Sequence, residues 1–151
     1  MIDGVMTKRL KVIPDERGRL MECLRCDDEL FEEFGQFYMT TTLPGVVKGW
    51  HLHHGQADNV VCVKGMIKLA LHDARDGSPT KGQTDEFFMG EHSPLLVKIP
   101  PGVLHGWKCV SPEEAYIVNA PTAPYRYDAP DQEERPHDDP AIGYDWGVTL
   151  R

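Results

Sequence analysis

The sequence predicts an all-β domain built as a small barrel, and three observations carry this prediction. Short apolar runs recur along the chain and are separated by Gly, Pro, Asn and Asp, a pattern typical of short strands joined by turns. Histidines occur at the end of one predicted strand and again after a Pro-Gly turn roughly 50 residues later, and a small barrel can direct imidazoles into its mouth from two such positions. With 151 residues, of which 40% are hydrophobic, the chain is long enough to bury a single core.

The strands are expected where apolar or alternating runs are bounded by turn residues. They cover Leu10–Ile13, Arg19–Leu24, Gln36–Thr42, Val46–His53, Asn59–Lys64, Met66–Leu71, Leu95–Ile99, His105–Val110 and Glu114–Val118. Lys64 and Gly65 predict a tight hairpin. The stretch Asp73–Gly82 predicts a longer loop because it is rich in Gly and Pro, and Asp27–Phe34 predicts one short helical turn with an aspartate at its start.

The segment 120–151 differs in texture from the rest of what we expect to be one domain, 1–151. Five prolines make it extended and irregular, at Pro121, Pro124, Pro130, Pro136 and Pro140. Four aromatic residues give it surface to pack, at Tyr125, Tyr127, Tyr144 and Trp146. We therefore expect a lid wrapped over the barrel, and a disordered acidic tail is the alternative.

The overall composition excludes two classes of partner and indicates a compartment. The chain has 16 basic and 24 acidic residues, a net charge of −8, whereas nonspecific nucleic-acid binding depends on dense Lys and Arg. No apolar run approaches the ~20 residues that a membrane-spanning helix needs. The first residues lack the basic and then apolar pattern of a signal peptide, so a cytoplasmic location is predicted. There, reduced structural thiols are expected at Cys23, Cys26, Cys62 and Cys109.

Two histidines on one strand are the first candidate site. Strict alternation along Val46–His53 places Gly49, His51 and His53 on the same face as Val47, and that face should look inward. Two inward imidazoles are costly unless they have partners or a chemical role. His105, after its Pro-Gly turn, begins another strand at the barrel rim. Imidazole suits both proton transfer near neutral pH and metal binding.

Two groups of residues have the spacing of a metal-binding motif pair. They are His51-x-His53-(x4)-Asp58-(x6)-Gly65 and Pro100-x-Gly102-x-x-His105. This spacing resembles the two signature motifs of the cupin superfamily. The resemblance implies a divalent metal, such as Fe, Mn, Ni or Zn, held by His51, His53, Asp58 and His105.

A narrower resemblance covers nearly the whole chain, through five blocks that fall in order. They are Asp15-x-Arg17-Gly18-x-Leu20-x-Glu22, Lys48-Gly49-Trp50-His51, Asp73-x-Arg75-x-x-Ser78-Pro79-Thr80-x-Gly82, Ile99-Pro100-Pro101-Gly102-x-x-His105-Gly106 and Asp138-Asp139-Pro140-x-Ile142-x-Tyr144-x-Trp146. The blocks resemble the dTDP-4-dehydrorhamnose 3,5-epimerase family. That resemblance implies a cupin jelly roll, a homodimer, no metal or other cofactor, and a nucleotide-diphosphate-linked 4-keto-sugar as substrate. An N-terminal β arm, Met6–Ile13, is suited to pairing with the second subunit.

The resemblance also implies roles for single residues. His51 matches the base that removes the proton next to the ketone, and His105 matches its helper. Arg17 and Glu22 match residues near the nucleotide and diphosphate, and Lys48 stands where the motif has an arginine, keeping the charge but losing the bidentate fork. The family base is paired with an aspartate from a C-terminal segment, for which no equivalent is visible in the sequence.

The acid that returns the proton has no direct counterpart. Counting along the strand after His105 places Val118 where the family has its catalytic tyrosine. Tyr116 lies two residues earlier on the same strand face, and Tyr125 and Tyr127 lie near the family's second tyrosine. These three are the candidate acids.

Three functions follow for the pocket. The first is an epimerase or isomerase of an NDP-4-keto-6-deoxy-hexose, in which His53, Gln56, Asp58 and Trp107 also contact the substrate. The family's active-site lysine is replaced by Asp58 or Asn59, which removes a positive charge. The second function is a metal-dependent cupin enzyme. The third is a sugar-nucleotide-binding module without catalysis.

Overall fold

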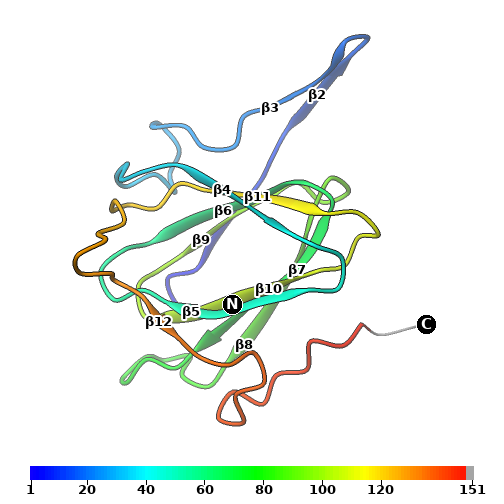
Figure 1. The fold of residues 1–151 in the computed structure, drawn as a ribbon. Helices are drawn as coiled ribbons and strands as arrows, with labels where there is room; N and C mark the ends of the chain where they lie inside the picture. The colour runs from blue at the N-terminus through cyan, green and yellow to red at the C-terminus, as the bar shows by residue number, and fades with distance from the viewer. Residues whose placement is uncertain (149–151) are drawn as a thin grey trace.

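The turn-rich chain folds into two facing antiparallel sheets, and a small hairpin stands apart from them (Figure 1). This computed structural model describes residues 1–148. The predicted all-β jelly-roll architecture is confirmed, and no helix occurs among residues 1–148. Accordingly, this part of the chain holds no helix long and apolar enough to cross a membrane.

Each sheet has five strands. The first sheet runs from edge to edge through β1 (Met6–Arg9), β9 (Leu95–Ile99), β6 (Asp58–Lys64), β11 (Ala115–Asn119) and β4 (Tyr38–Thr42). The second runs through β12 (Glu133–Glu134), β5 (Val47–Leu52), β10 (Val103–Cys109), β7 (Met66–Asp73) and β8 (Thr84–Gly90). The separate hairpin pairs β2 (Val12–Asp15) with β3 (Gly18–Met21) and projects from the barrel (Figure 1).

The predicted strands agree with the structure best in the barrel itself. From β4 onward, each predicted strand matches an observed one to within two residues at either end. β8 and β12 are not predicted, and β1 lies within the expected N-terminal β arm Met6–Ile13 but pairs with β9 of the same chain. β8 begins with Thr84, Asp85 and Glu86 at the edge of its sheet, where a polar start is tolerated but weakens the apolar signal.

The short helical turn expected at Asp27–Phe34 is wrong. Two consecutive reverse turns replace it, with Asp28 N–H donating to Arg25 O at 3.1 Å and Phe31 N–H donating to Asp28 O at 3.0 Å. The Asp28 carboxylate accepts from Arg25 N–H at 2.8 Å and from Lys8 Nζ at 2.5 Å. Its side chain therefore closes a turn and an ion pair instead of capping a helix.

The main core lies between the sheets. Ile67, Leu69 and Leu71 alternate along β7 and point inward, where they meet Val97 and Ile117 of the first sheet. All five are at most 1% exposed, and each such side chain contributes about 1.5–3 kcal/mol when it leaves water. This packed core joins the two sheets, and beside it polar residues of both sheets line a cavity.

A β-bulge changes which side chains of β5 face the cavity. His105 pairs with His51 and Trp107 pairs with Lys48. Between these two pairs β5 has two residues and β10 has one, so the extra residue forms a bulge in β5. Gly49 makes this possible, because a Cβ there would lie only 2.8 Å from the Cα of Gly106. The strict alternation expected for this strand is therefore wrong at its first half: Lys48, not Gly49, shares the inner face with His51.

The outer face of β5 packs against the C-terminal segment. Trp50 is fully buried and contacts the rings of Trp146, at 4.9 Å between centroids, and Tyr144, at 5.6 Å. Lys68 donates to the carbonyls of Asp145 and Gly147, at 3.2 and 2.8 Å. Residues 144–147 thus cover the outside of the strand whose inside carries the histidines.

Candidate active site

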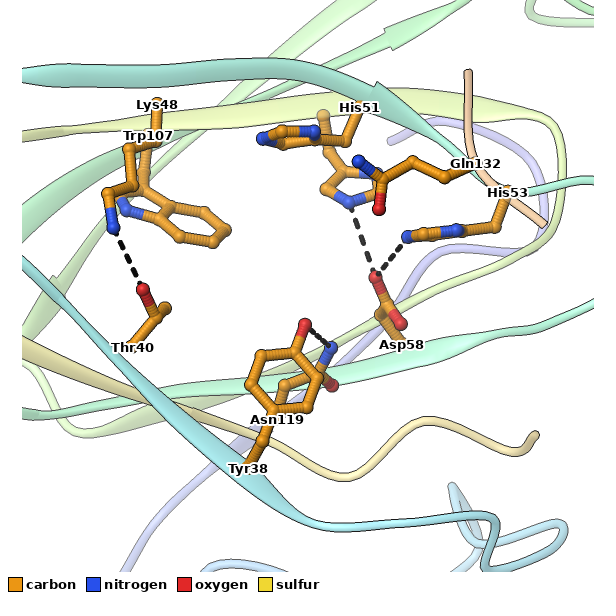
Figure 2. A pocket seen from close by; sticks show the side chains of 10 residues that line it. Tyr38, Thr40, Lys48, His51, His53, Asp58, Trp107, Asn119 and Gln132 are labelled. Atoms are coloured by element: carbon orange, nitrogen blue, oxygen red, sulfur yellow. Dashed lines mark hydrogen bonds and ion pairs between the residues drawn. The ribbon is translucent and has the colours of Figure 1, made fainter. Parts of the chain in front are cut away.

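A cavity of about 240 Å³ opens between the two sheets at one end of the barrel. Figure 2 shows side chains from both sheets converging on it. The lining residues are Tyr38, Thr40, Lys48, His51, His53, Asp58, His105, Trp107, Asn119 and Gln132. The cavity brings together His51, His53, Asp58, His105, Lys48 and Trp107 from the residues proposed on sequence grounds.

The imidazoles form one wall of the cavity. His51 of β5 and His105 of β10 are direct cross-strand partners, with ring centroids 6.2 Å apart. His53 follows β5 and lies 5.6 Å from His105 in the same measure. The pairing of two adjacent strands in this register therefore places three imidazoles within one small volume.

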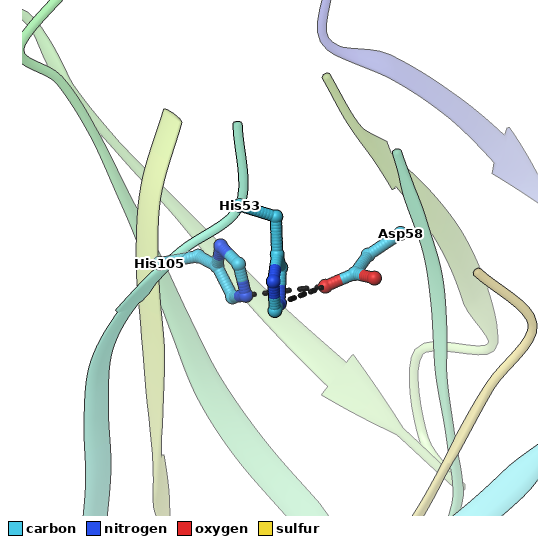
Figure 3. A group of neighbouring side chains, drawn as sticks. All are labelled: His53, Asp58 and His105. Atoms are coloured by element: carbon cyan, nitrogen blue, oxygen red, sulfur yellow. Dashed lines mark ion pairs between the residues drawn. The ribbon is translucent and has the colours of Figure 1, made fainter. Parts of the chain in front are cut away.

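A buried carboxylate faces two of these rings (Figure 3). Asp58 Oδ2 lies 3.2 Å from His105 Nε2 and 3.5 Å from His53 Nε2. Burial alone raises the pKa of Asp58, but the hydrogen bond and charge of His105, with the charge of His53, outweigh it and lower the pKa to about 2. Gln56 does not line the cavity; its Nε2 donates to Asp58 Oδ1 at 3.0 Å and holds the carboxylate from behind.

The outer nitrogens of the two rings are tied to the backbone. His105 Nδ1 lies 3.1 Å from Val103 O, and His53 Nδ1 lies 2.5 Å from Asp131 O. A carbonyl only accepts, so each Nδ1 carries the ring proton, and in a neutral ring the Nε2 lone pair points at Asp58. A proton or a cation must lie between Asp58 and these rings to avoid repulsion.

The same geometry fits a divalent metal. One ligand atom each from His53, Asp58 and His105 lies within 4.8 Å of the others, and backbone-anchored imidazoles are typical of metal ligands. His51, the fourth ligand implied by the cupin resemblance, is not part of this group.

Among the three cavity imidazoles, His51 is the one without a hydrogen-bond partner. Its Nδ1 is buried and unpaired, and the nearest carboxylate oxygen, Glu134 Oε1, is 3.8 Å away. Burial lowers the pKa of His51 below its usual 6.5, the charge of His105 lowers it further, and the Glu134 charge partly offsets both. The ring is therefore neutral at physiological pH and free to accept a proton.

Glu134 reaches His51 through strand pairing, because it lies directly opposite His51 in the β12–β5 pair. It occupies the C-terminal segment, where the family resemblance implies a carboxylate beside the base. The sequence gives no sign of this, since β12 is two residues long and flanked by irregular chain.

Lys48 lies at the other side of the cavity, next to Trp107. Its Nζ donates to Thr40 Oγ1 at 2.9 Å and to Thr41 O at 2.7 Å. Trp107 donates from Nε1 to Thr42 Oγ1 at 2.9 Å. The ammonium group is thus fixed by β4, and Lys48 is the one lysine or arginine that lines the cavity among residues 1–148.

Besides Gln56, five residues proposed on sequence grounds do not line this cavity. Arg17 lies at the turn of the projecting hairpin with its side chain 84% exposed, and Glu22 pairs with Arg25 on the surface. Tyr116 lies on the opposite face of β11, its ring 5.2 Å from Lys64 Nζ. The remaining two are Tyr125 and Tyr127, which stack edge-on against each other outside the cavity.

Sequence patterns alone did not identify Tyr38, Thr40, Asn119 and Gln132 as lining residues. Alternation along the sequence predicts that Tyr38 and Thr40 share a face of β4. Only the pairing of β4 with β11 in the structure places that face opposite the histidines. Asn119 lies one position beyond Val118, whose side chain points the other way, toward a cluster with Leu10 and Leu96.

Comparison with known proteins places this geometry in context. The family model for dTDP-4-dehydrorhamnose 3,5-epimerase matches residues 1–151. The chain is 40% identical over 151 residues to the spore coat polysaccharide biosynthesis protein SpsL of Bacillus subtilis (strain 168), covering 100% of both chains. It is 41% identical to the probable low-salt glycan biosynthesis epimerase Agl13 of Haloferax volcanii, covering 99% of this chain and 97% of that protein.

The fold agrees with the same assignment. The crystal structure of a dTDP sugar isomerase from Desulfovibrio desulfuricans G20 superposes with a TM-score of 0.93 at 31% identity, covering 99% of this chain and 95% of that one. The family match spans the whole chain. This chain belongs to the dTDP-4-dehydrorhamnose 3,5-epimerase family.

Proposed function

We propose that this protein is a sugar-nucleotide epimerase that acts on an NDP-4-keto-6-deoxy-hexose. The observation that carries the proposal is His51, a neutral imidazole that lines a cavity between two sheets and has the Glu134 carboxylate 3.8 Å from its buried Nδ1. Family membership supports the same reaction class. The relatives named as an epimerase and as a polysaccharide biosynthesis protein support a role in making a glycan precursor.

The chemistry uses the acidity of a C–H bond next to a ketone. His51 takes the proton, the C–H electron pair becomes the enolate, and a proton delivered to the opposite face of the carbon inverts it. Walls from two different sheets give access to both faces of a sugar ring held between them. His105, positioned by Asp58, and the Lys48 ammonium supply polar contacts for the enolate oxygen or the diphosphate. We propose that no cofactor takes part.

Proton NMR of dTDP-4-keto-6-deoxyglucose with the protein in D₂O tests this function. We expect loss of the C3 or C5 proton signal as deuterium enters, with an inverted product, and the position separates single from double epimerisation. Tight binding of the nucleotide sugar without any exchange would instead identify a binding module. If the protein showed neither binding nor exchange, the proposal of a nucleotide-sugar substrate would be rejected.

We propose that the protein acts as a homodimer. The projecting hairpin carries the exposed apolar side chains Ile13 and Leu20, 47% and 56% exposed, and the β4 edge adds Phe37 and Met39 at 62% and 55%. Exposed apolar groups on a protruding hairpin and on a sheet edge are typical of a surface that another chain covers. Because Arg17 lies on this hairpin, its predicted contact with the nucleotide requires the partner's cavity.

Light scattering checks the dimer. We expect a mass of twice 17.0 kDa for the protein, and a shift toward the single-chain mass for Leu20→Asp. Phe88→Asp is the matched control, since Phe88 is 57% exposed on β8, away from the hairpin, and it should remain dimeric. A single-chain mass for the unmodified protein at micromolar concentration contradicts this proposal.

A divalent metal at His53, Asp58 and His105 is the second candidate, favoured by their convergent geometry. Such a metal would polarise a substrate oxygen. Metal analysis of the purified protein discriminates: stoichiometric Mn, Fe, Ni or Zn that disappears in His53→Ala/His105→Ala supports the site. We expect a metal content well below stoichiometric and no change in deuterium exchange after chelation.

We also propose that the protein works in the cytoplasm. Its four cysteines are free, and Cys62 and Cys109 are buried as thiols in the barrel. Burial raises the pKa of Cys62 to about 12 and keeps it protonated. Unpaired thiols are typical of a reducing compartment.

A further inference from the structure

Tyr38 is the one tyrosine that lines the cavity within the described chain, residues 1–148. It belongs to β4 of the first sheet, whereas His51 belongs to the second sheet. Figure 2 shows its hydroxyl directed into the cavity from the wall opposite His51. A group at this place reaches the face of a bound sugar ring that His51 does not.

The direction of one hydrogen bond determines what the Tyr38 hydroxyl can do. Asn59 N–H donates to Asn119 Oδ1 at 2.9 Å, which fixes the orientation of the Asn119 amide. Asn119 Nδ2 then donates to the Tyr38 hydroxyl at 3.0 Å. Because an amide nitrogen only donates, the Tyr38 oxygen is the acceptor and its own proton stays available.

The surroundings of Tyr38 suit a proton donor. Burial raises the pKa of the Tyr38 hydroxyl and the nearby Asp58 charge raises it further, so the group keeps its proton at neutral pH. The hydrogen bond from Asn119 acts in the other direction and stabilises the oxygen once the proton has left.

No other tyrosine competes for this role. The Tyr116 ring lies under Lys64 on the far side of β11, and Tyr127 is 92% exposed. Val118 has no hydroxyl and packs into an apolar cluster. Tyr38 pairs directly with Asn119 across β4 and β11, so a hydroxyl reaches the cavity from the neighbouring strand.

We propose that Tyr38 is the catalytic acid that delivers the inverting proton. This inference rests on the proposed function. His51 removes the C–H proton, the enolate carbon takes the Tyr38 hydroxyl proton on its other face, and the O–H electron pair remains on Tyr38. Water then accepts the proton of His51 and gives one to Tyr38, which restores both groups.

Tyr38→Phe separates the two half-reactions. In D₂O we expect deuterium still to enter the substrate with retention, because His51 can remove and return a proton on one face. Inversion should fall by about 10²–10⁴, the usual contribution of a general acid. Tyr38 is 38% exposed on an edge strand, so the variant should unfold at the same temperature as the unmodified protein.

Tyr116→Phe and Tyr127→Phe are the matched controls, and both should invert the substrate at the unmodified rate. Inversion by Tyr38→Phe within threefold of the unmodified protein would overturn the assignment while leaving the epimerase intact. If the unmodified protein shows no exchange at all, the proposed function and the role of Tyr38 fall together.

Discussion

Replacing His51 by Asn should lower kcat/KM for the 4-keto-sugar by about 10²–10⁴ and abolish deuterium exchange, with no loss of fold. The reason lies in how the three cavity imidazoles are engaged. His53 and His105 are each held between a backbone carbonyl and Asp58, whereas His51 Nδ1 has no partner. Of the three, only His51 is not held between two such partners, and it is therefore the one free to take a proton from carbon.

The measurement is turnover together with exchange in D₂O, and a thermal melt checks the fold. His92→Asn is the control, because His92 is exposed in the turn after β8, outside the cavity lining. It should retain full activity. Turnover by His51→Asn within tenfold of the unmodified protein would contradict the assignment of the base.

The pH profile gives an independent readout of the same group. Burial holds the pKa of His51 below 6.5, so kcat/KM should fall on the acid side only as the pH drops through that lowered value. Glu134 raises the pKa of His51, and Glu134→Gln should therefore move the acid limb to still lower pH. An acid limb above pH 6.5 would show that another group, or a differently placed His51, controls the rate.

The second large effect concerns stability. Asp73→Ala should lower the free energy of unfolding by about 3 kcal/mol, in the lower part of the range for breaking a buried ion pair, because the Arg75 side chain stays 24% exposed. Asp73 is 0% exposed and its carboxylate accepts from Arg75 Nε at 2.9 Å and from Ser78 and Thr80 hydroxyls, both at 2.6 Å. The motif residues of this loop therefore stabilise its conformation by donating hydrogen bonds to one buried carboxylate.

Thermal unfolding measures the loss, expected at about 6–12 °C for a chain of this size. Asp76→Ala is the control from the same loop, since Asp76 is 96% exposed and pairs only with Lys81; its effect should stay within about 0.5 kcal/mol. Hydrogen bonds from Arg75 hold the pKa of Asp73 below its unfolded value. The deficit should therefore be constant above about pH 5 and shrink below pH 4, and an equal deficit at pH 3 would contradict this origin.

Much of the barrel and the two central histidines could be predicted from the sequence. Alternating apolar runs define strands such as β7, and the spacing of His51 and His105 places them on two strands that such barrels pair. The bulge at Gly49 could not be predicted, because it depends on the approach of Gly106 from another strand. Strict alternation therefore put Lys48 on the wrong face.

The missing acid shows the same limit. The position expected to hold a tyrosine is Val118, and reading along the chain leads to Tyr116, Tyr125 and Tyr127 as substitutes. The cavity tyrosine, Tyr38, is about 80 residues earlier and becomes its neighbour only through the β4–β11 ladder. When a functional group lies on the neighbouring strand instead of the expected one, no local sequence pattern indicates its position.

The aromatic contact between Trp50 and Trp146 has a consequence for how the chain matures. Roughly 90 residues separate β5 from the segment that covers its outer face, so on a translating ribosome this face waits about 5–20 s for its cover at ~5–20 residues per second. During that interval Trp50 and Leu52, buried in the finished protein, are open to solvent and to chaperones. The histidine-bearing strand is thus among the last parts of the barrel to be secured during synthesis.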